Sequence, residues 1–385
     1  MRAVFFVFLL GYGFLTALAW DRARKAFPVL DRRVPSAFGA AFILFMTFGP
    51  VAARVADGRG LHGTALWMLR LTDPWWAVIL WFTLLVLIVA AWNGLVRTVG
   101  FWRPSLRGLA IGPRREFLLC AGVVACLCFR GVSEANGLHV RTVHLRTPRL
   151  PAGSAPVRIA HLTDAHLGPW WGENRVRTVE AILRAWKADL LVTTGDILDG
   201  GRIGEAPLGL LVETLVPLGA VAIPGNHEYY AGIRACIGTY EGAGFRVLRD
   251  ESLDVKRDGQ VVLRAVGMDD PARRQDGLPR PPPESALLPD ADTERPFTLL
   301  LKHRPVVDPA AVGRFDLQLS GHTHGGQIWP FGRVVRDVYG FDTGLHNLGK
   351  GSLLYVSPGA GTWGPPMRFL QPAEITLFVL EAARQ

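Results

Sequence analysis

Four apolar stretches near the start of the chain constrain its fold more than any other feature of the sequence. Three of them, residues 3–20, 34–53 and 74–96, are runs of 18, 20 and 23 positions without a charged side chain. A helix needs about 20 apolar residues to cross the hydrocarbon core of a bilayer, so each run predicts a transmembrane span. The third run opens with Trp75 and Trp76, as interfacial aromatic residues do. The alternatives are buried core helices or, for the first run, a signal peptide.

The fourth stretch is shorter and allows two interpretations. Only 13 uncharged residues, 117–129, precede Arg130. That length suits a signal sequence, and the preceding Arg-Arg-Glu-Phe-Leu sequence at 114–118 resembles a twin-arginine export signal at an internal position, unless the arginine pair is there by chance. The segment can still span the membrane over 117–133 if Arg130 extends its side chain to the interface. We therefore expect about four transmembrane helices, with residues 1–134 as an anchor region.

Basic residues between the apolar stretches indicate how the anchor is oriented. Segments 21–33 and 97–115 each contain five Arg and Lys residues, whereas segment 54–73 contains three. The positive-inside rule therefore places the first two segments in the cytoplasm and everything after residue 134 on the extracytoplasmic side of the cell membrane. Residues 151–385 carry 24 Arg and Lys against 27 Asp and Glu, so the formal net charge of +9 belongs to the membrane region. We accordingly expect no nucleic-acid partner.

From residue 157 onward, short apolar runs alternate with amphipathic segments. Residues 157–162 and 297–301 have the composition of buried strands, and the apolar positions of 174–187 recur at helical spacing. Alternation of strand and helix indicates parallel strands in a layered α/β fold. We expect a linker over 135–156 and a second domain over 157–385.

Polar side chains suited to metal binding follow five of the predicted strands. In chain order they are Asp164, His166, Asp196, Asn226, His227, His303, His322 and His324. Ligands bind outside the carboxyl ends of strands in α/β sheets, so we expect these side chains at one edge of the fold. Asp164 and His166 are two residues apart, as are His322 and His324, so an extended strand end would point both members of a pair the same way.

The chemistry of this set is that of a site with two metals. Imidazole, carboxylate and amide ligands without a thiolate favour Mn, Fe, Zn or Co, and the two oxygens of Asp196 can bridge two cations. Two divalent cations about 3.5–4 Å apart clamp a phosphoryl group and deprotonate a bridging water. Asp199 is expected to orient a ligand or to cap the next helix, and His161 to pack in the core.

In this order, the motifs resemble those of the calcineurin-like metallophosphoesterase superfamily over about residues 155–381. The sequences Gly-Met-Asp-Asp-Pro at 267–271 and Pro-Met-Arg-Phe at 366–369 are similar to a membrane-associated bacterial phosphodiesterase branch. Its members include transmembrane proteins with a metallophosphoesterase domain. The resemblance implies a layered α/β/β/α sandwich as the fold of the second domain.

The resemblance also implies a role for each motif residue. The first metal would be held by Asp164, His166 and His324, and the second by Asn226, His303 and His322. Asp196 would bridge the two metals. His227 would protonate the leaving group as a general acid or steady the phosphate.

The sequence therefore predicts a membrane-anchored, two-metal phosphoesterase that uses a bridging hydroxide. Its substrates would be phosphate esters, most specifically phosphodiesters of lipid headgroups or envelope components, and its other partner would be membrane lipid. Two alternatives stay open: a cytoplasmic-facing pyrophosphatase acting on a nucleotide-linked lipid, and a non-catalytic regulatory metal-binding domain on a membrane protein. A transporter is disfavoured because the three long apolar runs contain no ionisable acidic or basic residue of the kind that lines transport pathways.

Overall fold

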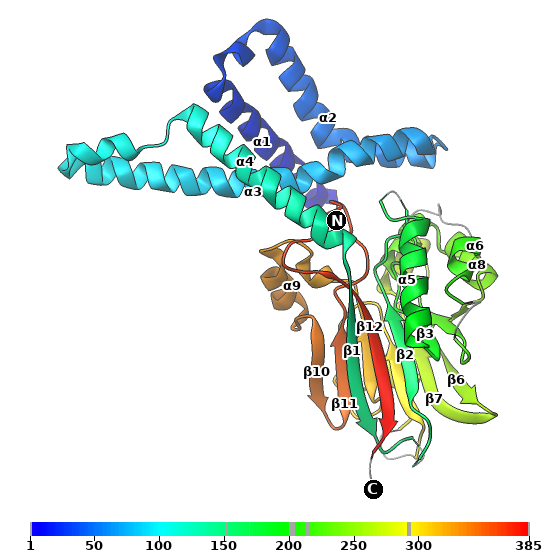
Figure 1. Cartoon of the computed structure of the whole chain (residues 1–385). Coiled ribbons are helices and arrows are strands. Elements are labelled where there is room, and N and C mark those ends of the chain that lie inside the picture. The colour runs from blue at the N-terminus through cyan, green and yellow to red at the C-terminus, as the bar shows by residue number, and fades with distance from the viewer. Residues whose placement is uncertain are drawn as a thin grey trace. The chain divides into compact units, whose positions relative to one another are not determined.

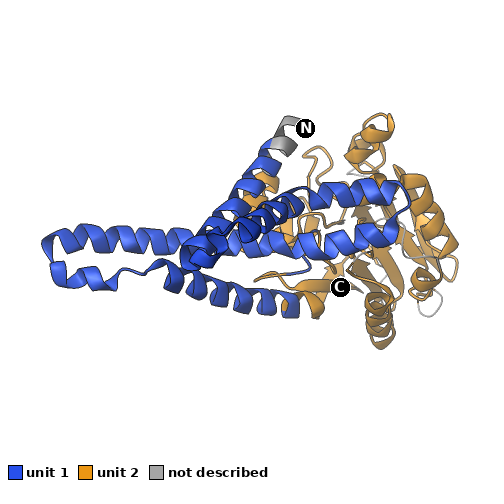
Figure 2. Cartoon of the chain, turned by 90° about the horizontal axis from the view of Figure 1, so that it is seen from above, with its two compact units in different colours: residues 1–133, 364–367 blue, residues 134–363, 368–385 orange. Residues whose placement is uncertain are grey.

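The chain, described as a computed structural model, divides into two compact units (Figures 1 and 2). The first comprises residues 1–133 and 364–367, and the second comprises residues 134–363 and 368–385. The structure describes residues 2–150, 153–168, 170–199, 205–212, 216–290 and 294–383, without the side chains of residues 2–6, 8 and 205.

The first unit is helical. Its elements are α1 (Arg2–Ala26), η1 (Pro28–Asp31), α2 (Arg33–Gly58), α3 (His62–Trp102), η2 (Pro104–Leu109) and α4 (Pro113–Asn136), whose last residues belong to the second unit. Aromatic side chains join α1 to α3. Tyr12 stacks on Trp76 with ring centroids 3.9 Å apart, and the indole of Trp75 donates a hydrogen bond to Thr16 Oγ1 at 3.1 Å.

Three helices in the described part of the chain are long and apolar enough to cross a membrane, one fewer than the sequence predicted. They are α2, α3 and α4. The first apolar run lies in α1, which is not among these three helices, and the end of that helix carries the charged residues Asp21, Arg22, Arg24 and Lys25. The run at 117–133 does qualify, because α4 continues past Arg130 to Asn136.

The second unit contains two six-stranded sheets. The first has the order β1 (Leu138–Thr147), β12 (Ala373–Ala382), β2 (Val157–Leu162), β3 (Leu190–Thr193), β4 (Ala220–Ala222), β5 (Arg246–Val247). The second has the order β10 (Gly344–Gly349), β11 (Ser352–Val356), β9 (Leu317–Ser320), β8 (Phe297–Leu301), β7 (Gln260–Gly267), β6 (Glu251–Arg257). The central strands β2 to β5 and β7 to β9 run parallel, as predicted, whereas β12 is antiparallel to β2 and each outer hairpin is antiparallel.

Apolar side chains from both sheets meet in a central core that includes Val192 of β3 and Leu299 of β8. The outer face of the first sheet is covered by α5 (Glu173–Trp186), α6 (Glu205–Gly209) and α8 (Ile233–Gly242). The outer face of the second sheet is covered differently from the helical layer that we expected. Leu288, which follows η4 (Glu284–Ala286), and loop residue Phe315 pack there on Leu300. The remaining elements are α7 (Asn226–Ala231), η3 (Pro271–Asp276), η5 (His324–Gly326) and α9 (Phe331–Tyr339).

Strand β1 lies inside the range that we expected to be a linker. It pairs in parallel with β12 from Leu138 opposite Ala373 to Thr147 opposite Ala382. Val143 and Leu145 of β1 pack on the central core, and Leu138 packs against the core on the other face of the sheet, while most other side chains of the strand are exposed. The many polar residues among these exposed side chains concealed the strand in the sequence. Residues 151 and 152 of the expected linker lie outside the described residues.

Candidate metal centre

The eight motif residues converge where five strands end. Asp164 and His166 follow β2, Asp196 follows β3, Asn226 and His227 begin α7 after β4, His303 follows β8, and His322 and His324 follow β9. Both sheets therefore supply side chains to one site from their carboxyl ends, as the sequence predicted.

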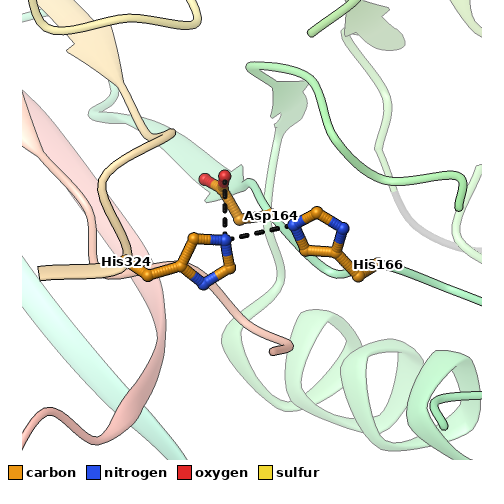
Figure 3. A group of neighbouring side chains, drawn as sticks. All are labelled: Asp164, His166 and His324. Carbon is orange, nitrogen blue, oxygen red and sulfur yellow. Dashed lines mark hydrogen bonds and ion pairs between the residues drawn. The ribbon is translucent and has the colours of Figure 1, made fainter. Parts of the chain in front are cut away.

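The first cluster consists of Asp164, His166 and His324 (Figure 3). The Nε2 atoms of the two imidazoles are 3.1 Å apart, and His324 Nε2 lies 3.5 Å from Asp164 Oδ1. All three side chains are buried. Three ligand atoms of this kind, facing one another at such distances, form a pocket suited to a divalent cation.

The second cluster consists of Asp196, His303 and His322, with Asn226 beside it. His303 Nε2 is 3.2 Å from Asp196 Oδ2, 3.2 Å from Asn226 Oδ1 and 3.1 Å from His322 Nδ1. His303 Nδ1 donates a hydrogen bond to the carbonyl oxygen of Thr194 at 2.7 Å. Because a carbonyl can only accept, the neutral ring carries its proton on Nδ1 and turns the lone pair of Nε2 toward the cluster, as metal-binding histidines do.

Asp196 faces both clusters. Its Oδ2 atom is 3.2 Å from His303 Nε2 and 4.0 Å from His166 Nε2. Burial raises the pKa of Asp196, but the neighbouring His303 and His227 more than offset this and hold it well below the usual range. Its carboxylate is therefore ionised and available to two cations. The donor set and its arrangement fit a site for two divalent cations.

The carboxylates of the site strongly affect the pKa of His303. Burial lowers the pKa of His303, but the carboxylates of Asp196 and Asp164 more than offset this and raise it to about 10. Burial and the positive charge of His303 together lower the pKa of His322 to about 2, so that ring is neutral. A proton on His303 therefore occupies the position where a cation would satisfy the same carboxylates.

His227 lies at the edge of the two clusters. Its Nδ1 atom is 3.1 Å from Asp199 Oδ1, and its backbone N–H donates to Asp196 Oδ1 at 2.8 Å. Burial lowers the pKa of His227, but Asp196 and Asp199 more than offset this and raise it to about 9. Because Nδ1 donates to Asp199, the proton on Nε2 is free to be given to another group. The other carboxylate oxygen of Asp199 lies 3.5 Å from His166 Nδ1, close enough for a charge interaction with a second histidine of the site.

The backbone at the strand ends differs from the extended conformation that we expected. Asp164, His166, Asp196, His322 and His324 all have positive φ angles, between 45° and 68°. Residues other than glycine rarely adopt this left-handed conformation. Residues that do adopt it are strained, and they occur most often at functional sites. Asp164 and His166 both enter the first cluster, whereas His322 enters the second cluster and His324 the first, so only the second pair differs from the expected common direction.

Two glycines allow these bends to pack closely. A Cβ atom on Gly321 would lie 2.0 Å from Asp164 Oδ2, and one on Gly225 would lie 2.2 Å from Asp196 Oδ1. No side chain fits at either position without displacing a cluster carboxylate.

Glu228 organises the loops of the site, a role that sequence reasoning missed. One of its carboxylate oxygens accepts hydrogen bonds from the backbone N–H groups of Ile197 and Leu198 and from the hydroxyl of Tyr240. The other accepts from the N–H groups of Asp196 and Gly225. Glu228 is fully buried and thereby ties the loop after β3 to the start of α7. Its position directly after the Asn-His pair was the only signal in the sequence.

Two arginine residues hold segments that carry histidines of the site. Arg368 is fully buried, donates to the carbonyl oxygen of Pro358 at 2.7 Å and places Nη2 3.3 Å from His324 Nδ1. Arg304 makes two hydrogen bonds to Asp270, at 2.9 and 3.1 Å, so Asp270 fixes the residue next to His303. We singled out the segments of Arg368 and Asp270 only for their resemblance to a family branch.

His161 is a core residue, as expected. It is fully buried, and its Nε2 atom lies 2.8 Å from Thr194 Oγ1. Burial lowers its pKa to about 3, so the ring is neutral.

Comparisons with known proteins agree with this geometry. Residues 157–326 match the family model described as calcineurin-like phosphoesterase. An "uncharacterized metallophosphoesterase" of Aquifex aeolicus is 37% identical over 250 residues, which cover 64% of this chain and 94% of that protein. The "transmembrane protein with metallophosphoesterase domain" of Danio rerio is 28% identical over 346 residues, which cover 84% of this chain and 78% of that one.

A structural match is found with the 5'-nucleotidase precursor of Thermus thermophilus. It has a TM-score of 0.33 and 13% sequence identity, and it covers 58% of this chain. The chain spans about half the length of that nucleotidase, 55%.

Proposed function

Because the chain belongs to the calcineurin-like metallophosphoesterase family, we propose that it is a membrane-anchored phosphodiesterase acting on lipid headgroups or envelope components. A single observation carries the catalytic part of this proposal. Asp196 Oδ2 lies between two buried clusters of metal-binding side chains, 3.2 Å from a histidine of one and 4.0 Å from a histidine of the other. A carboxylate in that position suits a pair of cations better than a single one.

The proposed ligands are the clusters themselves. The first cation would bind Asp164, His166 and His324, the second would bind Asn226, His303 and His322, and Asp196 would bind both. Imidazole, carboxylate and amide donors without a thiolate support Mn, Fe, Zn or Co. When bound, such cations polarise phosphoryl oxygens and lower the pKa of a coordinated water.

The protein's own acid in this proposal is His227. Asp199 holds the ring through Nδ1 at 3.1 Å, and the raised pKa of about 9 keeps the ring protonated at neutral pH. From the edge of the clusters, Nε2 would donate its proton to the leaving alkoxide. General-acid catalysis of this kind contributes about 10²- to 10⁴-fold in rate.

The choice of a lipid-linked diester rests on two further features. The segments at 267–271 and 366–369 resemble those of membrane-associated phosphodiesterases. In addition, α4 ends at Asn136 and β1 begins at Leu138, so almost no chain separates a candidate membrane helix from the first strand of the catalytic unit. A connection of one residue keeps that strand within a few ångströms of the helix end.

The test is hydrolysis by the full-length protein in detergent and in phospholipid vesicles. We expect turnover of an aryl phosphodiester that chelation abolishes and Mn²⁺ restores, together with slower hydrolysis of the matching monoester. Activity that survives thorough metal removal would contradict the metal centre. A strong preference for the monoester would contradict the diester assignment alone.

The proposed side of the membrane is tested separately. The basic segments 21–33 and 97–115 support an extracytoplasmic catalytic unit. A reporter that is active only outside the cytoplasm, fused after residue 385, should therefore give a signal. A reporter signal from the cytoplasm would instead favour a pyrophosphatase acting on a nucleotide-linked lipid.

A further inference from the structure

Two exposed aromatic side chains of the catalytic unit lie beside its metal centre, and two more follow η5, which begins at His324. Among the described residues of this unit, four large aromatic side chains are strongly exposed: Tyr230 by 57%, Trp329 by 54%, Phe331 by 45% and Trp363 by 54%. The ring of Tyr230 lies 5.3 Å from that of His227, and the ring of Trp363 lies 6.2 Å from it. Exposed Trp and Tyr side chains gathered in one place are typical of a protein surface at the headgroup level of a membrane.

Helix α9, which includes Phe331, turns an apolar face outward. Phe331, Val334 and Val338 recur at helical spacing, and the two valines are exposed by 56% and 69%. Tyr339 lies about a quarter turn around the helix from this row, and its ring lies 5.6 Å from that of His322, which connects the helix to the metal centre. A surface helix normally buries its apolar face against the protein, so this one has its apolar face available to another medium.

Basic residues lie on the side of α9 away from the row of Phe331, Val334 and Val338. Arg333 and Arg336 are both exposed, Arg336 lies 3.7 Å from Asp342, and Asp337 is the only acidic residue of the helix. Apolar and aromatic residues on one face and arginines on the other are the composition of helices that lie in the interface of a bilayer and contact anionic lipids.

The chain enters the catalytic unit at the same edge. Glu134, near the end of α4, accepts a hydrogen bond from the backbone N–H of Gln371 at 2.8 Å. Gln371 and Leu370 line a cavity of about 260 Å³ together with Trp329 and Arg333. The entry point of the chain from a candidate membrane helix, the apolar face of α9 and the metal centre are therefore neighbours within the catalytic unit.

We propose that Trp329, Phe331, Val334, Val338 and Leu370, here called the apolar rim, dock into the interfacial region of the lipid bilayer that anchors the chain. The bilayer is favoured over a protein partner because the chain arrives at the rim directly from an apolar helix and because Arg333 lines the same cavity as Trp329 and Leu370 of the rim. Docking would hold the metal centre at the level of lipid headgroups. The substrate class then follows from the proposed function, on which this last step rests, whereas docking itself requires no turnover.

The position of the rim can be measured without any substrate. The full-length chain, with its four natural cysteines replaced, would carry Val338→Cys labelled with an environment-sensitive fluorophore, in vesicles of phosphatidylcholine and phosphatidylglycerol. Val261→Cys is the matched control, because Val261 is also an exposed valine but lies near the hairpin end of β7, away from the carboxyl end where the site forms. We expect a blue-shifted emission and quenching by lipid-borne nitroxide at position 338 only.

Two results would overturn the proposal. A label at position 338 that is as solvated as the one at position 261 would show that the rim lies in water. A shielded label that lipid-borne nitroxide fails to quench would show that protein, such as a second copy of the chain, covers the rim instead.

A second measurement separates docking from chemistry. The double variant Val334→Ser, Val338→Ser should hydrolyse a soluble aryl phosphodiester within about twofold of the natural chain, while hydrolysis of a phosphodiester lipid in vesicles should fall about tenfold or more. Val261→Ser should change neither rate. Equal loss on both substrates would contradict docking. If the label at position 338 is quenched but no lipid is hydrolysed by the natural chain, docking stands and the proposed substrate class fails.

Discussion

Replacing Asp199 by asparagine should move the alkaline limit of activity to lower pH. Asp199 holds His227 Nδ1 at 3.1 Å, and the carboxylates of Asp196 and Asp199 raise the pKa of His227 to about 9 against the effect of burial. A histidine with a raised pKa is a competent acid below that pKa and loses its proton as the pH rises through it. The substitution Asp199→Asn would keep the size of the side chain but remove one of the two charges.

The size of the effect follows from the titration of one group. With a pKa of about 9, roughly nine-tenths of His227 is protonated at pH 8. A pKa lower by one unit leaves roughly half protonated, and one lower by two units leaves about one-tenth. The variant should therefore lose about twofold to tenfold more activity at pH 8 than at pH 6, relative to the natural chain. The ratio of the two rates cancels any pH dependence that both proteins share.

The assay is kcat for an aryl phosphodiester between pH 6 and pH 9.5, with metal content measured at each pH. Asp254→Asn is the matched control, because Asp254 is paired with Arg264 on the hairpin of β6 and β7 and does not contact the metal centre. A rate ratio that stays constant with pH while metal content is unchanged would refute the role of Asp199 in setting the pKa of His227. A change in the control variant would point to a general loss of stability.

Three further predictions concern the metal centre. Asp196→Ala should lose both metals and nearly all activity, whereas His227→Ala should keep its metals by elemental analysis and lose about 10²- to 10⁴-fold in rate; equal metal loss in both would contradict the assignment. Gly321→Ala should weaken metal binding about 10- to 100-fold in competition with a chelator, because the new Cβ would lie 2.0 Å from Asp164 Oδ2; unchanged affinity would show that the loop can yield. Metal retention should fall as pH is lowered, because the carboxylates raise the pKa of His303 to about 10 and a proton competes with the cation there; retention independent of pH would exclude this competition.

Local patterns in the sequence determined most of the architecture and the set of candidate ligands. Runs of uncharged residues predicted the helices α2, α3 and α4. The number of consecutive apolar residues needed to cross a bilayer is known, and it can be counted in the sequence. Short apolar runs predicted β2 and β8, and the polar residues at the ends of the predicted strands predicted the site. Strand ends gather at one edge of a parallel sheet, so adjacency in three dimensions could be inferred without knowing the loops.

The elements that the sequence did not reveal are those whose pattern depends on a distant partner. The sequence of β1 has the composition of a polar linker. Its strand conformation depends on pairing with β12, more than 200 residues away, which places Val143 and Leu145 against the central core. Helix α9 shows its outward apolar face only when Tyr339 is known to lie beside His322. The periodicity of apolar residues shows that a helix has an apolar and a polar face. It does not show whether the apolar face contacts protein, lipid or water.

The interior of the site was decided by the tertiary structure. His324 meets Asp164 across 160 positions of sequence, and Glu228 binds backbone groups of the loop after β3 that no motif connects to it. The left-handed backbone at the cluster residues and the charge-shifted pKa of His227 arise only when both sheets bring their strand ends together. Spacing along the chain names the residues that can bind metal, whereas their distances, protonation and orientation come from groups that are remote in sequence and near only after folding.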